Sequence, residues 1–137
     1  MEFVREVLAN DRRLTSHSGE VVRSEMVRLK NLPHSTLFLG GPKGQMIIEF
    51  VEDKGFYIRA FGQGELEEWL AVDEQLPADW IKVDISGHVD DMPRRVLVSE
   101  DIALDLAKEF YFSGKRASGR LWVRSIDLMN DTRHGPR

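Results

Sequence analysis

The glycine-rich run at residues 40–44 is the first group in this sequence whose residue types could do chemistry. It reads Gly-Gly-Pro-Lys-Gly and invites comparison with phosphate-binding loops. Such a loop places Gly-Lys-Ser or Gly-Lys-Thr at the start of a helix, so that backbone amides and the helix dipole meet the phosphate. Here Gly44 and Gln45 follow the lysine, and a strand pattern follows them. The run therefore predicts a plain turn.

A second candidate group is formed by His88, Asp90 and Asp91, whose side chains are of the types that bind cations. The chain has four histidines, and no two of them have the i, i+4 spacing that places two metal ligands on one helix face. A solvated loop is therefore the favoured interpretation, and we predict no metal site and no cofactor. A small enzyme with a site at residues 88–91 stays as a lesser alternative.

Adjacent carboxylates at Glu67–Glu68 and Asp90–Asp91 have the spacing of possible acid and base pairs. That use requires an apolar site that raises the pKa of one carboxyl group. Adjacent acids on a solvated loop are much commoner than a catalytic dyad, nothing nearby suggests the burial that would raise a pKa, and no serine has the context of a nucleophile elbow. We therefore expect no catalytic residue and predict that the protein is not an enzyme.

Residues 65–91 form the most strongly charged part of the chain, with nine acidic residues and Lys82 as the one base. This segment would repel phosphate groups, which argues against direct nucleic-acid binding. It would suit a basic protein partner through complementary potential. The alternative is a solvated face without a partner. The residues predicted to contact a partner are Glu65, Glu67, Glu68, Trp69, Asp73, Glu74, Asp90 and Asp91.

Large aromatic residues lie in this acidic segment at Trp69 and Trp80. Aromatic side chains in a charged region can anchor a protein interface. They can equally cover the edge of the core, and both interpretations stay open. Trp122, which lies between two apolar neighbours, is expected in the core.

The residues from 96 to 124 have the clearest pattern of strand, helix and strand. Ser99 can cap the helix, apolar side chains recur every four residues from Ile102, and Gly114 can end the helix in the left-handed conformation. Leu121–Arg124 then suits a short strand. This segment predicts a helix packed on a sheet.

The strongest strand signal is the alternation in residues 45–51 and 56–61, joined by a turn at 52–55. This pattern predicts a β-hairpin. Further strands are predicted at 35–39 and 80–85.

Two N-terminal helices are predicted at Glu2–Asn10 and Glu20–Asn31, the second with Ser18 as a possible N-cap. Residues 65–72 fit either a helical turn or an edge strand. Residues 86–93 are expected to form a polar loop.

Together these elements predict an α+β domain. It has a mainly antiparallel sheet of about five to six strands, with two N-terminal helices and one C-terminal helix packed on it. The length of 137 residues favours a single domain, and residues 130–137 are expected to form a flexible tail. The chain has no cysteine and no apolar run near the ~20 residues that span a bilayer. We therefore expect a cytoplasmic protein without membrane contact.

Residues 80–123 carry a series of features in a fixed order. A strand near a tryptophan is followed by a glycine-containing polar loop, a proline, an apolar pair, a helix with a Glu-Phe pair, a Gly-Lys-Arg turn and a closing tryptophan. These residues are Trp80, Gly87, Pro93, Leu97, Val98, Glu109, Phe110, Gly114, Lys115, Arg116 and Trp122. In this order the segment, about a third of the chain, resembles the C-terminal half of Imm1-type immunity proteins of bacterial polymorphic toxin systems. Ala117 stands where that family usually has a proline.

The resemblance implies a small cytoplasmic inhibitor that binds the C-terminal domain of a cognate toxin and blocks it stoichiometrically. Such toxins often attack nucleic acids, as nucleases or deaminases, and so present basic clefts. Carboxylates from Glu65 to Asp91 would suit such a cleft. The alternative is a non-catalytic adaptor or regulatory domain that binds another protein. The sequence does not predict the oligomeric state.

Overall fold

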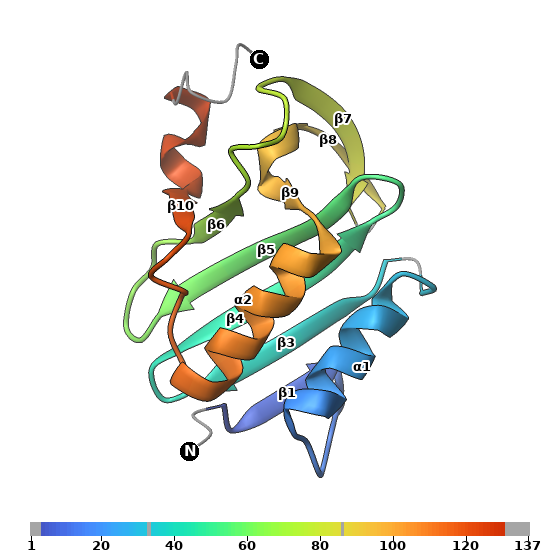
Figure 1. The fold of residues 1–137 in the computed structure, drawn as a ribbon, viewed down its shortest axis with the longest axis vertical. Helices are drawn as coiled ribbons and strands as arrows, with labels where there is room; N and C mark the ends of the chain where they lie inside the picture. Colours follow the sequence, from blue (N-terminus) through green and yellow to red (C-terminus); the bar gives the residue numbers. More distant parts are fainter. Residues whose placement is uncertain (1–3, 33, 86, 131–137) are drawn as a thin grey trace.

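One antiparallel sheet carries the fold in the computed structural model, which describes residues 4–32, 34–85 and 87–130 (Figure 1). The expected tail, apart from residue 130, lies outside the described residues. The strands of this sheet are β1 (Glu6–Ala9), β2 (Arg12–Arg13), β3 (Thr36–Gly41), β4 (Gly44–Val51), β5 (Gly55–Gly62), β6 (Trp69–Val72), β9 (Leu97–Val98) and β10 (Leu121–Arg124). They lie in the order β10-β6-β5-β4-β3-β1-β2, and β9 also pairs with β5.

The remaining elements cover the two faces of this sheet. They are the helices α1 (Gly19–Leu29) and α2 (Glu100–Ser113), the hairpin strands β7 (Trp80–Ile85) and β8 (His88–Pro93), and the 3-10 turns η1 (Arg94–Val96) and η2 (Ser125–Asn130). Figure 1 shows α1 and α2 side by side across one face of the sheet. No helix in the described part of the chain is both long and apolar enough to cross a membrane.

Several local predictions are confirmed. Ser18 and Ser99 cap the two helices, with their side-chain oxygens accepting from Val21 N and Ile102 N. Gly114 ends α2 at a φ of 75°, where an L side chain would be strained. The hairpin of β4 and β5 forms as expected. Each of these features depends on residues close in sequence, which is why the local pattern predicts them.

Three predictions about local structure are wrong. Residues 6–9 form β1 in place of the predicted N-terminal helix, because pairing with β3 buries Val7 opposite Leu39. The polar segment 86–93 contains β8, which pairs with β7 and can carry polar residues on an exposed hairpin. The predicted five to six strands and two N-terminal helices are also wrong. In the described residues the sheet has eight strands, a separate hairpin accompanies it, and one helix lies toward each end of the chain.

The undecided segment 65–72 contains a strand, β6. It lies between β5 and β10, so it is an inner strand and not an edge strand.

Two hydrophobic cores lie on opposite faces of the sheet. The larger packs α1 and α2 on the side chains of alternate strand residues, among them Met46, Ile48 and Ile58. The smaller packs the β7–β8 hairpin residues Val83 and Met92 with residues of β4, β6 and β9. We call the first side of the sheet the helix face, and the uncovered part of the second side the open face.

Candidate functional site

Strand alternation decides which side chains reach the open face. In β4 and β5, Met46, Ile48 and Ile58 belong to the core under the helices. Successive side chains of a strand point to opposite faces, so Ile47 and Arg59 lie on the open face. They are directly opposite each other in the register of the two strands.

An apolar strip crosses the open face. Leu8 lies opposite Phe38, and Phe38 lies opposite Ile47, in three neighbouring strands. Phe61, two residues beyond Arg59, is on the same face. All four apolar side chains are half-buried, and among the described residues neither hydrophobic core includes them. We call Leu8, Phe38, Ile47 and Phe61 the apolar strip.

A charged cluster lies at the end of this strip, and Arg59 is at its centre. Its Nη2 donates to Glu49 Oε1 at 2.7 Å, and its Nη1 is 3.7 Å from Glu68 Oε2. The guanidinium carbon is 5.5 Å from the centre of the Tyr57 ring, within the range of a cation–π contact. Glu49 is only 5% exposed. We call Glu49, Tyr57, Arg59 and Glu68 the Arg59 cluster.

The electrostatics of Tyr57 show which charges surround this cluster. Burial of the ring, followed by the negative charge of Glu68, raises the pKa of Tyr57 to about 12, and Arg59 opposes the shift. Glu49 and Asp90 raise it further. Asp90 pairs with the buried Val83 in the hairpin, so it lies on the side of β8 that faces the sheet. The negative charges of Asp90 and Glu68 therefore both disfavour ionisation of the Tyr57 hydroxyl group.

Other residues predicted to bind a partner lie outside the Arg59 cluster, and one of them, Trp69, is on the helix face. Trp69 is paired with Ala60, and the guanidinium of Arg116 stacks on its ring at 4.2 Å. Glu67 accepts from Arg124 Nη1 at 3.0 Å. In the loop before β6, a side chain on Gly62 would collide with the carboxylate of Glu65.

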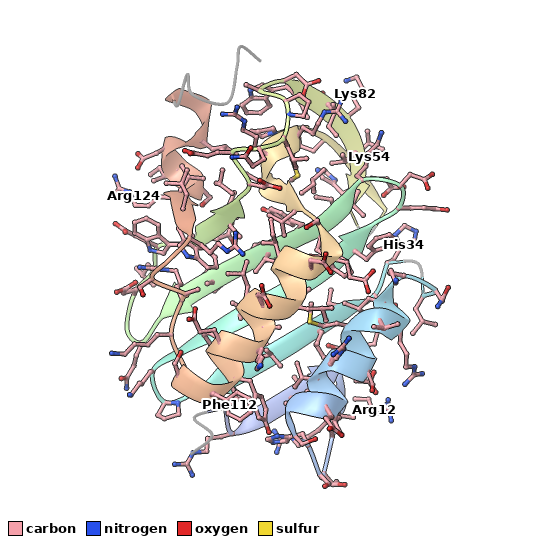
Figure 2. All side chains as sticks on the ribbon, in the orientation of Figure 1. Arg12, His34, Lys54, Lys82, Phe112 and Arg124 are labelled. Carbon is pink, nitrogen blue, oxygen red and sulfur yellow. The ribbon has the colours of Figure 1, made fainter. Side chains whose placement is uncertain are left out.

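Three more residues predicted to contact a partner, Asp73, Glu74 and Asp91, also lie outside the Arg59 cluster. Asp73 closes a turn after β6, accepting from the backbone of Gln75, and Glu74 is exposed beside it. Asp91 pairs with Lys82 at 3.3 Å. Figure 2 shows Lys82 and Arg124 on opposite sides of the molecule, so the ion pairs of Asp91 and Glu67 are far apart. The acidic segment therefore forms no single patch; Glu68 belongs to the Arg59 cluster, and Asp90 lies on the sheet-facing side of β8.

The three tryptophans have different surroundings. Trp122 packs against the larger core, and its Nε1 donates to Ala117 O at 3.0 Å. Trp69 and Trp80 are half-buried, which suits side chains that cover the edge of a core.

The other candidate groups have simple structural roles. Gly41 pairs with Gly44 at the end of β3 and β4, so the glycine-rich run is the turn of a hairpin, as predicted. His88 is exposed on β8. Among the described residues, no group of three or more His, Asp or Glu side chains is placed to hold a metal ion.

A groove of about 840 Å³ lies between α1 and α2. Its walls include Met26 and Phe112, and its rims carry both Arg23 and Asp105. With both signs of charge at the rim, this groove has no clear electrostatic preference.

Sequence reasoning missed Tyr57, Glu49 and Arg59. The signal was the second face of the β4–β5 hairpin, which alternates apolar, charged and aromatic side chains. A sheet face with that mixture is typical of a surface that contacts another molecule.

Comparison with protein-family models finds no match to this chain, and comparison with curated proteins finds no similar protein.

Proposed function

We propose that this protein is an immunity protein that binds a cognate bacterial toxin domain and neutralises it stoichiometrically. The observation that carries the proposal is the open face, where the apolar strip leads directly to the Arg59 cluster. Apolar surface rimmed by charged residues marks protein interaction sites, and complementary charge increases the rate of association. Such a surface can block a partner without any chemical step.

The resemblance of residues 80–123 to Imm1-type proteins supports the same proposal. Trp80 begins β7, Pro93 ends β8 and Gly114 caps α2, so these residues specify a scaffold. The binding surface is then free to differ between proteins that neutralise different toxins.

The charge of the surface supports a toxin that acts on nucleic acids. A nuclease or deaminase presents a basic cleft to phosphates, and the carboxylates of Glu68 and Asp90 have the complementary sign. The partner would be the C-terminal domain of the toxin, met in the cytoplasm, with no direct contact to nucleic acid or membrane. Neutralisation needs only that the toxin's substrate be excluded.

A non-catalytic adaptor that binds another basic protein is the second candidate function. The same open face supports it, because the surface selects the charge of a partner and not its activity. A neighbouring gene for a large secreted protein with a variable C-terminal domain would favour immunity.

The test is co-expression with the C-terminal domain encoded by that neighbouring gene. We expect the protein to rescue cells from the toxicity of this domain and to co-purify with it at a fixed ratio. Continued toxicity at matched expression, together with no complex between the purified proteins, would exclude this immunity pair.

A further inference from the structure

We propose that the partner docks on the open face and inserts an arginine or lysine side chain between Glu68 and Asp90, with a neighbouring apolar side chain on the apolar strip. This inference deepens the proposed function, on which its first experiment depends. It names the face of the molecule and the chemistry of the contact, a cation beside an apolar group on a protein surface.

The two carboxylates of the Arg59 cluster lie at unequal distances from the guanidinium. Glu49 is 5% exposed and holds Arg59 at 2.7 Å. Glu68 lies 3.7 Å from the same guanidinium, beyond hydrogen-bonding distance. The charge of Arg59 is thus matched mainly by Glu49, and Glu68 keeps most of its capacity to accept hydrogen bonds from a partner.

Asp90 lies on the same side of the sheet as this cluster. Tyr57 packs against the smaller core, which contains Val83, and Asp90 is directly opposite Val83 in the hairpin. Glu68, just before β6, lies 3.7 Å from Arg59, whose guanidinium is beside the Tyr57 ring. Both carboxylates therefore lie around Tyr57, and both raise the pKa of its hydroxyl group. One Oδ atom of Asp90 accepts from the backbone amide of Asp91 at 2.8 Å, and a carboxylate has further acceptor sites. A cation placed between two carboxylates gains attraction from both.

The apolar strip is continuous with the Arg59 cluster. Leu8, Phe38 and Ile47 form a row across three strands, and the next residue in that row is Arg59. The row is half-buried, so a partner that covers it removes the remaining apolar area from water, which favours binding. Charge and apolar area are therefore available to one partner at the same time.

The main rival surface is the loop before β6. Leu66 is 99% exposed and lies between Glu65 and Glu67, but Glu67 already pairs with Arg124. A single exposed side chain offers little area, and scattered surface hydrophobics are normal. The open face offers several apolar side chains in register, so we choose it over the loop.

The first experiment measures affinity for the co-expressed toxin domain with variants of equal charge change. The paired substitution Glu68→Gln with Asp90→Asn should weaken binding by at least about fivefold at low salt, with a smaller effect at high salt. The matched control, Glu65→Gln with Glu74→Gln, removes the same charge from exposed sites outside the Arg59 cluster. Equal weakening by the two pairs would show that only net charge matters and would overturn the proposal.

A second pair of variants tests the apolar contact. Ile47→Thr should weaken binding, since threonine keeps the strand propensity and loses apolar area. Leu66→Thr should leave affinity unchanged. The opposite result, a loss at Leu66 only, would place the contact on the loop and overturn the proposal. Thermal unfolding of each variant checks that it is folded.

The second experiment does not depend on the toxin. The peptide acetyl-Arg-Leu-Arg-amide is titrated into the isotope-labelled protein and followed by amide NMR shifts. We expect salt-sensitive shifts at Ile47, Glu68 and Asp90, and their loss in the Glu68→Gln, Asp90→Asn variant. Shifts centred on the loop at 63–67 or on the α1–α2 groove would overturn the proposal. Open-face shifts without any toxin complex would instead reject the proposed function alone.

Discussion

Arg59 and Glu49 form an ion pair diagonally across β5 and β4, with 2.7 Å between Nη2 and Oε1. The carboxylate is buried, while the arginine side chain is 26% exposed. Breaking a fully buried pair costs about 3–5 kcal/mol, and the partial exposure of Arg59 reduces that cost. We expect Arg59→Met to lower the free energy of unfolding by about 2 kcal/mol, measured by urea denaturation.

The double variant Arg59→Met with Glu49→Gln is the matched control for this prediction. Removing both charges leaves no uncompensated buried carboxylate, so its stability should be closer to that of the wild type than the stability of Arg59→Met is. Strictly additive losses would show that the two side chains do not interact. Arg124→Met, which breaks exposed pairs with Glu67 and Asp127, should cost clearly less than Arg59→Met.

Ionisation of the Tyr57 hydroxyl group should lower the stability of the folded protein at alkaline pH. Burial and the charge of Glu68 raise the pKa of Tyr57 from 10.0 to about 12. Because the folded-state pKa is the higher one, this contribution is fully present below pH ~10 and is lost as pH rises through about 12. A shift of one unit corresponds to about 1.4 kcal/mol, so the loss approaches about 3 kcal/mol. Urea unfolding at about pH 9 and about pH 11 should show about half of this loss, about 1.4 kcal/mol, because pH 11 is still below the folded-state pKa.

The variant Tyr57→Phe identifies the group responsible for this alkaline loss. Phenylalanine has no ionisable hydroxyl, so the decrease in stability between the two pH values should be smaller than in the wild type. An identical decrease in both proteins would mean that Tyr57 titrates near its usual pKa in the folded state. The ultraviolet absorbance of tyrosinate gives an independent reading of the same titration.

The sequence predicts the parts of this fold that depend on near neighbours. The caps of α2 and the β4–β5 hairpin follow from residues a few positions apart. The segment 6–9 has a spacing that also suits a helix, and its strand pairing depends on β3, some thirty residues away. A nine-residue helix is marginal by itself, so the non-local pairing decides the structure.

The candidate site likewise combines features that the local sequence predicts with features that depend on the assembled fold. Glu68 and Asp90 can be selected from the sequence as acidic residues of one segment. Their convergence on Tyr57 depends on the assembly of β5, β6 and β8, for which the sequence holds no local signal. The ion pairs that neutralise Glu67 and Asp91 are likewise set by the fold, since the arginine of the first pair lies 57 positions away.

Gly114 is predicted to be the most sensitive glycine of the segment after α2. Its φ of 75° lies in the left-handed region, where an added Cβ atom costs about 1 kcal/mol. Gly114→Ala should therefore lower the thermal unfolding midpoint. Gly119→Ala is the matched control, because an added Cβ there meets no atom within 4 Å; equal shifts for both variants would contradict the conformational explanation.

Asp79 and Arg94 close the base of the β7–β8 hairpin and should contribute to acid resistance. Arg94 Nε and Nη2 donate to the two carboxylate oxygens at 2.8 and 3.1 Å, and these hydrogen bonds lower the pKa of Asp79 below its usual value. Because the folded-state pKa is the lower one, this contribution is present above the usual value of 3.8 and is lost as pH falls through the folded pKa. Asp79→Asn should therefore move the acid-unfolding midpoint, followed by tryptophan fluorescence, to higher pH. Glu74→Gln removes an exposed carboxylate nearby and should leave that midpoint in place; an equal shift for both variants would assign the effect to net charge.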